Sequence, residues 1–288
     1  MYNTSNIWPS NLVEELAFRR GILFLGAGVS ATAKNNEGKS PDTWESFIKE
    51  VKGLVKNVSQ EDMNFIDSRL DHQDYLLALQ AIFDKCDPGE YSKFLKDHYS
   101  RGGYVPSEVH RAIKELDSKI VITTNFDKIY DNFCKEDGYV VWDFESSKSI
   151  ISSLKSPENL IVKAHGSIDD TEKIIFTSKQ YYESREKFPE FYDLLYALFM
   201  THTVVFFGYG LNDPDINLLL QFLHNTASSS CPHYIAKANG TPQQLIKHWK
   251  ETYNVNIIEY GEDNTKFEEA MLELRDLVIE FRDKRQMP

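Results

Sequence analysis

Short apolar runs alternate with longer amphipathic stretches along most of the chain. The runs share a high content of aliphatic, β-branched and aromatic side chains and occupy residues 21–25, 119–123, 159–163, 203–207, 233–236 and 255–260. Each run is too short for a helix with one buried stripe and is bounded by Gly, Asn or Asp. Such runs are typical of parallel strands that are buried on both faces.

The segments between these runs have helical spacing. Residues 44–55 and 267–281 each place their apolar side chains on one stripe, and residues 213–223 do the same after Asp213, a good N-cap, and Pro214, a good first helical residue. Strands that alternate with helices predict an α/β fold: a Rossmann-like parallel sheet with helices on both faces.

One stretch breaks the alternation. From Trp44 to Leu116 the apolar spacing is helical and no strand is evident. We interpret this stretch as a helical insertion packed over the strand ends. The sequence therefore predicts a single domain over residues 1–288, with a Rossmann-like core at about 1–40 and 118–288 and the insertion at about 41–117.

Composition narrows the function classes. The 288 residues include 44 acidic and 32 basic side chains, a net charge of −12, which disfavours autonomous nucleic-acid binding because that needs a basic surface. No apolar run is long enough to span a membrane, and the start does not resemble a secretory signal. The three cysteines are scattered, without a C-x-x-C pair, as expected of free thiols in the cytoplasm.

The first apolar run leads into Gly26-Ala27-Gly28-Val29-Ser30. Glycine permits a sharp turn and lets a diphosphate approach backbone amides at a helix start. The alternative is a tight strand-to-helix turn without a ligand. Because no third glycine completes the G-x-G-x-x-G pattern, a hydride-transfer dehydrogenase is disfavoured.

Polar groups and glycines also follow three later runs. Thr124-Asn125-Phe126-Asp127 follows the second run, His165-Gly166 lies just beyond the third, and Gly208-Tyr209-Gly210 follows the fourth. Each has a structural alternative: an Asx turn or N-cap, a hydrogen-bonded core histidine, and a tight turn. Ligands of open α/β sheets bind at the carboxyl ends of the strands, so the four loops together predict one site. A histidine there could act as a general base.

The ordered set GAGVS, TTNFD, HGS and GYG resembles the sirtuin family, and its bacterial sirtuin-like branch more than its protein deacylases. The resemblance covers nearly the whole chain. It implies that Asn125 orients the nicotinamide ribose and a water, that Asp127 lies near the nicotinamide carboxamide, and that His165 is the catalytic histidine.

The resemblance also implies an NAD-binding set. The residues that would hold NAD are the diphosphate loop (Gly26, Ala27, Gly28, Ser30), the nicotinamide loop (Pro41, Asp42), Thr124 at the second strand end, and Gly208 and Tyr209 at the adenosine half.

Two departures from sirtuin deacylases bear on function. Thr43 and Trp44 follow Pro41-Asp42 where an aromatic residue and an arginine are expected, and the three scattered cysteines cannot form the four-cysteine zinc module. With no recognisable peptide clamp, water is the simplest acceptor. We therefore expect a NAD⁺ glycohydrolase that releases nicotinamide and ADP-ribose and needs no metal.

Proteins of the bacterial branch resemble abortive-infection effectors that deplete NAD. Such an enzyme needs control, so we expect a homo-oligomer and a separate regulatory partner, such as a HerA-type ATPase. Three alternatives stay open: a deacylase or ADP-ribosyltransferase, a catalytically silent NAD or ADP-ribose sensor, and a nuclease subunit. For the last, Asp169-Asp170 and Asp213/Asp215 are more simply caps and loops. The sequence leaves open whether Trp44 and the insertion gate the cleft.

Overall fold

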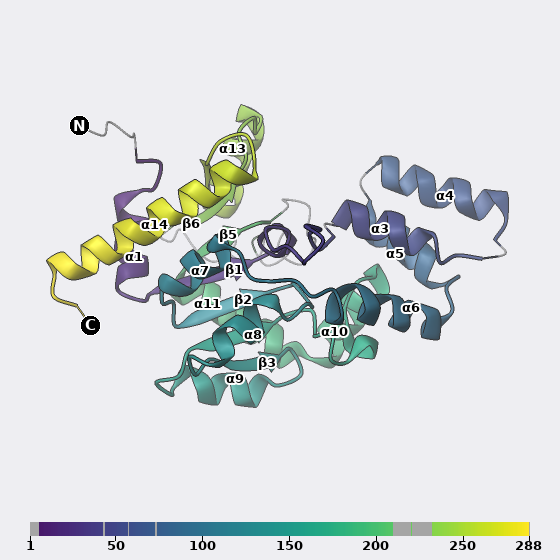
Figure 1. The fold of residues 1–288 in the computed structure, drawn as a ribbon, viewed down its shortest axis with the longest axis horizontal. Helices are drawn as coiled ribbons and strands as arrows, with labels where there is room; N and C mark the ends of the chain where they lie inside the picture. The colour runs from purple at the N-terminus through teal and green to yellow at the C-terminus, as the bar shows by residue number, and fades with distance from the viewer. Residues whose placement is uncertain are drawn as a thin grey trace.

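A parallel sheet forms the centre of the protein. The computed structural model describes residues 6–42, 44–56, 58–72, 74–209, 220 and 232–287. Within them, seven strands pair in the order β3-β4-β2-β1-β5-β6-β7, and every pair is parallel (Figure 1). The chain leaves β1 toward β2 on one side and reaches β5 on the other, so the order reverses at β1. This confirms the predicted Rossmann-like α/β fold.

The predicted strands agree closely with the observed ones. Those strands are β1 (Gly21–Leu25), β2 (Ile120–Thr123), β4 (Leu160–Lys163), β5 (Thr203–Phe207), β6 (His233–Lys237) and β7 (Val255–Glu259). The sequence pattern missed β3 (Val140–Asp143), which lies at the edge of the sheet. Val141 and Trp142 of β3 are exposed, so this strand lacks the buried apolar run that marks the others.

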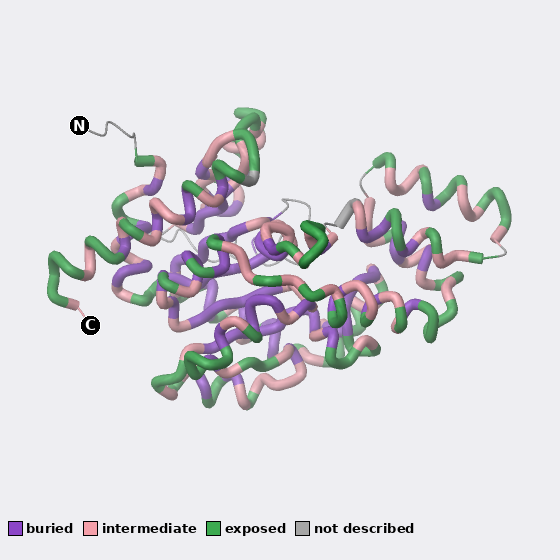
Figure 2. The backbone as a smooth tube through the Cα atoms, in the orientation of Figure 1, coloured by how far each residue is buried: buried purple, intermediate pink, exposed green. Residues whose placement is uncertain are grey.

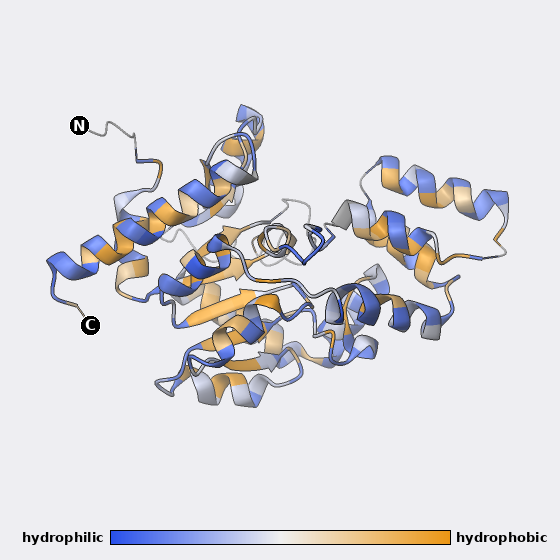
Figure 3. Ribbon diagram, viewed as in Figure 1, coloured by the Kyte–Doolittle hydropathy of each residue, from blue (hydrophilic) through white to orange (hydrophobic). Residues whose placement is uncertain are grey.

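Helices cover both faces of the sheet. One face carries α1 (Ser10–Ala17), α7 (Glu108–Glu115), α8 (Ile129–Lys135) and α14 (Asn264–Lys284). The other carries α9 (Ser147–Leu154), α10 (Ser178–Lys187), α11 (Pro189–Thr201) and α13 (Gln243–Tyr253). Alternate strand residues serve the two cores: Leu23 and Leu25 face the first set of helices, and Ile22 and Phe24 face the second. The buried, hydrophobic strands between exposed helix surfaces are visible in Figures 2 and 3.

Between β1 and β2 the elements are helical. The short α2 (Ala27–Ser30) follows β1, and then come α3 (Trp44–Lys52), α4 (Gln60–Asp71), α5 (Tyr75–Phe83), α6 (Pro88–Leu95) and the π-helix η1 (Lys96–Ser100) before α7. Figure 1 shows α3 to α6 beyond one end of the sheet, away from α1 and α14. Their side chains form a third core, which Ile168 and Phe176 join from the loop after β4.

Helix ends differ from the expected ones. The helix expected over residues 44–55 is α3, which ends at Lys52 because the chain turns at Gly53. The closing helix is longer than predicted, since Asp263 caps α14 by accepting the amide of Lys266. The helix expected over residues 213–223, with Asp213 and Pro214 at its start, lies outside the described residues. In the described part of the chain, no helix is long and apolar enough to cross a membrane.

Candidate active site

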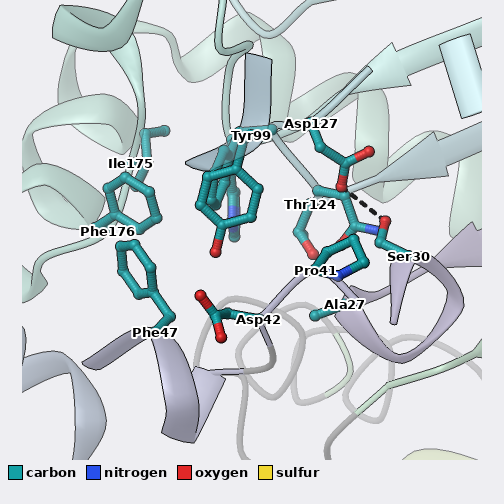
Figure 4. A pocket seen from close by; sticks show the side chains of 13 residues that line it. Ala27, Ser30, Pro41, Asp42, Phe47, Tyr99, Thr124, Asp127, Ile175 and Phe176 are labelled. Atoms are coloured by element: carbon teal, nitrogen blue, oxygen red, sulfur yellow. Dashed lines mark hydrogen bonds between the residues drawn. The ribbon is translucent and has the colours of Figure 1, made fainter. Parts of the chain in front are cut away.

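Three neighbouring strands bring the predicted loops together. Leu25, Thr123 and Lys163 are partners in the registers of β1, β2 and β4, so the loops that follow them begin side by side. A pocket opens at this edge of the sheet (Figure 4). The predicted residues that line it are Ala27, Ser30, Pro41, Asp42, Thr124, Asn125, Asp127 and His165.

A hydrogen-bond network joins the first two of these loops. The side-chain amide of Asn125 donates to the main-chain oxygen of Gly26 at 2.9 Å and to Ser30 Oγ at 3.0 Å. Ser30 Oγ in turn donates to Asp127 Oδ2 at 2.7 Å, the bond drawn in Figure 4. The hydroxyl of Ser30 therefore fixes Asn125 and Asp127 relative to each other.

Asp127 also supports the turn that carries it. Its Oδ1 accepts the amide of Ile129 at 2.9 Å, the contact expected of an Asx turn. The residue is 6% exposed, and its two carboxylate oxygens have these two different partners. The Asx turn that the sequence offered as the structural alternative is thus observed. Asp127 also lines the pocket, so the turn and a role in the site are compatible.

His165 is held from both sides. The residue is 3% exposed, and its ring packs edge-on against Tyr181, whose hydroxyl lies 3.4 Å from His165 Nδ1. Its main-chain oxygen accepts the amide of Ile175 at 3.1 Å. The next residue, Gly166, has a φ of +83°, and a Cβ there would lie 2.8 Å from the carbonyl oxygen of Lys173. The loop therefore requires glycine directly after the histidine.

The two glycine turns support each other behind the pocket. The amides of Gly26 and Gly28 donate to the main-chain oxygens of Phe207 and Gly208, both at 2.9 Å. A Cβ on Gly208 would lie 2.3 Å from the amide nitrogen of Val29. Two amides that the sequence assigned to a diphosphate are thus engaged within the protein.

Four predicted residues lie outside the pocket lining of the described structure: Gly26, Gly28, Gly208 and Tyr209. Tyr209 still contacts the site, because its hydroxyl donates to Thr124 Oγ1 at 2.9 Å. Gly210, the last residue of the GYG motif, is outside the described residues.

Aromatic side chains form one wall of the pocket, with Phe47 and Phe176 across it from Ser30 and Asp127 (Figure 4). The wall consists of Phe47, Tyr99, Phe126 and Phe176, with Ile175 beside them. Phe47 stacks on Phe176 with ring centroids 5.2 Å apart, and Tyr99 meets Phe126 edge-on at 4.6 Å. A pocket that combines an apolar aromatic side with a few convergent polar groups is typical of small-molecule binding sites.

The helices between β1 and β2 supply part of this wall. Phe47 comes from α3 and Tyr99 from η1, and the hydroxyl of Tyr99 points toward Asp42 in Figure 4. Burial, reinforced by the carboxylates of Asp42 and Asp127, raises the pKa of Tyr99 well above its usual range. Tyr99 therefore keeps its proton at neutral pH. Asp42 Oδ2 also lies 2.9 Å from Nε2 of His98, a second residue of η1.

The sequence missed the wall for identifiable reasons. Phe126 lies inside the TTNFD motif, and Ile175 and Phe176 belong to a short apolar run soon after HGS. These three residues therefore had a local sequence signal that could have identified them. Phe47 fitted an ordinary helix stripe, and Tyr99 and His98 carry no local signal.

Trp44 is the first residue of α3, and its side chain lies outside the described part of the structure. In the described ranges, no group of three or more His, Cys, Asp or Glu side chains is arranged to hold a metal ion.

Glycine turns and polar side chains at the carboxyl edge of a parallel sheet define an α/β protein of the Rossmann-like class. Within that class the comparison with known families is specific. Residues 119–258 match the model of the SIR2-like domain, and this match confirms the resemblance to sirtuin-like proteins.

Three relatives illustrate the kinship. "Defense-associated sirtuin 2" of Bacillus subtilis is 23% identical over 278 residues, which is 92% of this chain and 26% of the relative. "NAD(+) hydrolase ThsA" of Cytobacillus dafuensis is 26% identical over 200 residues, 69% of this chain and 37% of the relative. "NAD(+) hydrolase ThsA" of Acinetobacter baumannii is 26% identical over 217 residues, 74% of this chain and 41% of the relative. The chain thus spans between about a quarter and two fifths of the length of these relatives.

Proposed function

We propose that the protein is a NAD⁺ glycohydrolase. The observation that carries the proposal is the meeting of Asn125, Asp127 and His165 in one pocket, from two neighbouring strand ends, beside an aromatic wall. Two of the relatives are named as NAD⁺ hydrolases, which supports the same reaction. NAD⁺ contributes a positively charged nicotinamide, a good leaving group, so the protein mainly needs to bind, orient and deliver water.

In this proposal the polar residues have separate roles. Asn125 positions the nicotinamide ribose and the attacking water, and Asp127 helps place the nicotinamide. His165 accepts a proton from the water, directly or through a ribose hydroxyl, a role worth roughly 10²–10⁴-fold in rate. The bond between ribose and nicotinamide breaks, the water oxygen bonds to the ribose carbon, and one proton is released. The products are nicotinamide and ADP-ribose.

The rest of the predicted set would bind NAD around these groups. Ala27 and Ser30 line the pocket beside Pro41 and Asp42, where the nicotinamide half would lie against the aromatic wall. The mutual support of Gly26, Gly28 and Gly208 shapes the turn that would receive the diphosphate. Thr124 and Tyr209 are linked to each other and would extend the site toward the adenosine half.

The acceptor is the point on which the alternatives differ. We expect NAD⁺ with an acyl-lysine peptide to give free ADP-ribose and an unchanged peptide when the mixture is followed by mass spectrometry. O-acyl-ADP-ribose would instead identify a deacylase, and a peptide that gains ADP-ribose would identify a transferase. NAD⁺ bound but unchanged would identify a silent sensor.

We further propose that residues 1–288 act as one catalytic unit, a core with a helical insertion, working in the cytoplasm as a NAD-depleting effector of antiphage defence. The similarity to the relative named "Defense-associated sirtuin 2" supports the defence role. Such an effector requires control, so we propose homo-oligomerisation and a separate partner of the HerA ATPase type. Nucleotide consumption should then rise on assembly or on addition of the partner, and a monomer that hydrolyses NAD⁺ at full rate alone would contradict this.

A further inference from the structure

A fully buried lysine lies at the end of β4, outside the pocket lining. Lys163 is 1% exposed, although lysine is almost never fully buried unless it is paired. Its Nζ lies 3.0 Å from Oδ2 of Asp131 on α8 and donates to the main-chain oxygen of Asp127. Asp131 is buried as well, and its burial raises the pKa of its carboxyl group. A buried ion pair is weak evidence for stability, so its place in the fold calls for another reason.

The register of the sheet gives that reason. Lys163 pairs with Thr123, and these are the last paired residues of β4 and β2. Asn125 lies two residues after Thr123, and His165 lies two residues after Lys163. Both paired side chains brace the loops beyond them: Thr123 Oγ1 accepts the amide of Asn125 at 3.0 Å, and Lys163 Nζ binds the carbonyl of Asp127.

Lys163 is therefore a direct link between the strand end that carries His165 and the turn that carries Asp127. The carboxylate of that same Asp127 accepts from Ser30, which accepts from Asn125. We propose that Lys163 is a positioning residue that sets the distance between His165 and the Asn125–Asp127 turn, with Asp131 present to keep its charge stable in the core. This inference rests on the proposed hydrolysis of NAD⁺ only for its kinetic test.

The test separates positioning from charge balance. Lys163→Met alone would leave Asp131 buried and unpaired, which is strongly destabilising. Lys163→Met/Asp131→Leu removes both charges, and such apolar replacements are often neutral for stability. We expect the double variant to keep a wild-type melting temperature within a few degrees, to lose at least about tenfold in kcat, and to change KM by less than about threefold. A folded double variant with wild-type kcat would overturn the proposal.

Asp131→Asn provides the complementary variant, because it keeps Lys163 and its bond to Asp127. We expect a lower melting temperature but a kcat within about twofold of wild type. If folded Asp131→Asn loses as much kcat as the Lys163 variant, activity follows the ion pair and the proposal is wrong. Lys247→Met, on an exposed pair with Glu251 of α13, is the matched control and should change neither quantity.

Amide hydrogen exchange tests the same link without any activity. In the double variant, residues 124–129 should exchange at least about tenfold faster than in wild type, while β6 should be unchanged. Unchanged exchange at 124–129 would overturn the positioning role. A folded wild-type protein that hydrolyses no NAD⁺ even with its assembly partner would refute the proposed function instead, and the exchange result would still decide the role of Lys163.

Discussion

At the scale of single residues, the site depends on one small hydroxyl. Ser30 Oγ accepts from Asn125 and donates to Asp127, so one atom bonds both side chains. Ser30→Ala removes the hydroxyl that links the side chains of Asn125 and Asp127, so the distance between these two side chains can increase. We expect kcat to fall by about tenfold or more, since small misplacements of catalytic groups are costly. Steady-state NAD⁺ hydrolysis measures this.

The control is Ser156→Ala, which removes a hydroxyl bonded to the main-chain oxygen of Ser153 in the turn before β4, at the end of that strand opposite the pocket. It should retain wild-type kcat and KM. Equal activity of Ser30→Ala and Ser156→Ala would show that the hydroxyl link does not matter.

The sequence predicted these residues because each lies directly after a strand. To predict that Asn125, Asp127 and His165 lie close together, only one rule is needed: the carboxyl ends of parallel strands meet at one edge of the sheet. Tyr99 and His98 could not be found in this way. They reach the site only because α3 to η1 fold back over the strand ends, and nothing in the local sequence specifies that long-range contact.

At the scale of elements, the contact between the two glycine turns holds the site from behind. Gly208 has a φ of +63°, and a Cβ there would lie 2.3 Å from the amide nitrogen of Val29. We expect Gly208→Ala to combine left-handed strain of about 1–2 kcal/mol with overpacking of about 1–3 kcal/mol. Urea unfolding should show the sum as a loss of unfolding free energy, and NAD⁺ hydrolysis should fall with it.

Gly138→Ala is the matched control, because Gly138 has a φ of +78° and a Cβ added there would meet no atom within 4 Å. Gly138→Ala should lose only the part of the unfolding free energy that comes from backbone strain. A loss of unfolding free energy as large as that of Gly208→Ala would mean that the contact between the turns contributes nothing.

Strands were easier to predict than the elements around them. The strands buried on both faces carry continuous apolar runs, whereas β3 at the sheet edge exposes Val141 and Trp142 and has no such run. Helix α14 was predicted from its stripe, but its start depends on the cap by Asp263, a single side-chain contact. Periodicity therefore located the elements, and local capping determined their ends.

At the scale of the whole molecule, buried histidines should make stability depend on pH. Burial lowers the pKa of both His110 and His233 to about 4. Between about pH 6.5 and 4 the unfolded chain binds these protons and the folded chain does not, so the free energy of unfolding falls as pH falls. The loss amounts to roughly 3 kcal/mol per histidine over that interval.

His233→Asn tests one of the two, because an asparagine oxygen can replace Nδ1, which accepts the amide of Val204 at 3.1 Å. The variant should retain most stability at pH 7.5 and lose less on acidification, with a slope smaller by up to about 1.4 kcal/mol per pH unit. Urea unfolding across pH 4.5–7.5 measures it. Parallel curves for wild type and variant would exclude the titration of His233 as a cause.

In the whole molecule, one edge of the sheet and the helices between β1 and β2 surround one pocket. Our central proposal is that the protein hydrolyses NAD⁺ in this pocket. The most direct measurement is the release of nicotinamide and free ADP-ribose from NAD⁺ by wild type, Asn125→Ala and His165→Ala, each with and without its assembly partner. We predict equal amounts of both products from wild type and at least about 100-fold slower release from each folded variant. The proposed reaction would be contradicted if both variants released the products at the wild-type rate. It would also be contradicted if the wild type and both variants bound NAD⁺ and none of them released products.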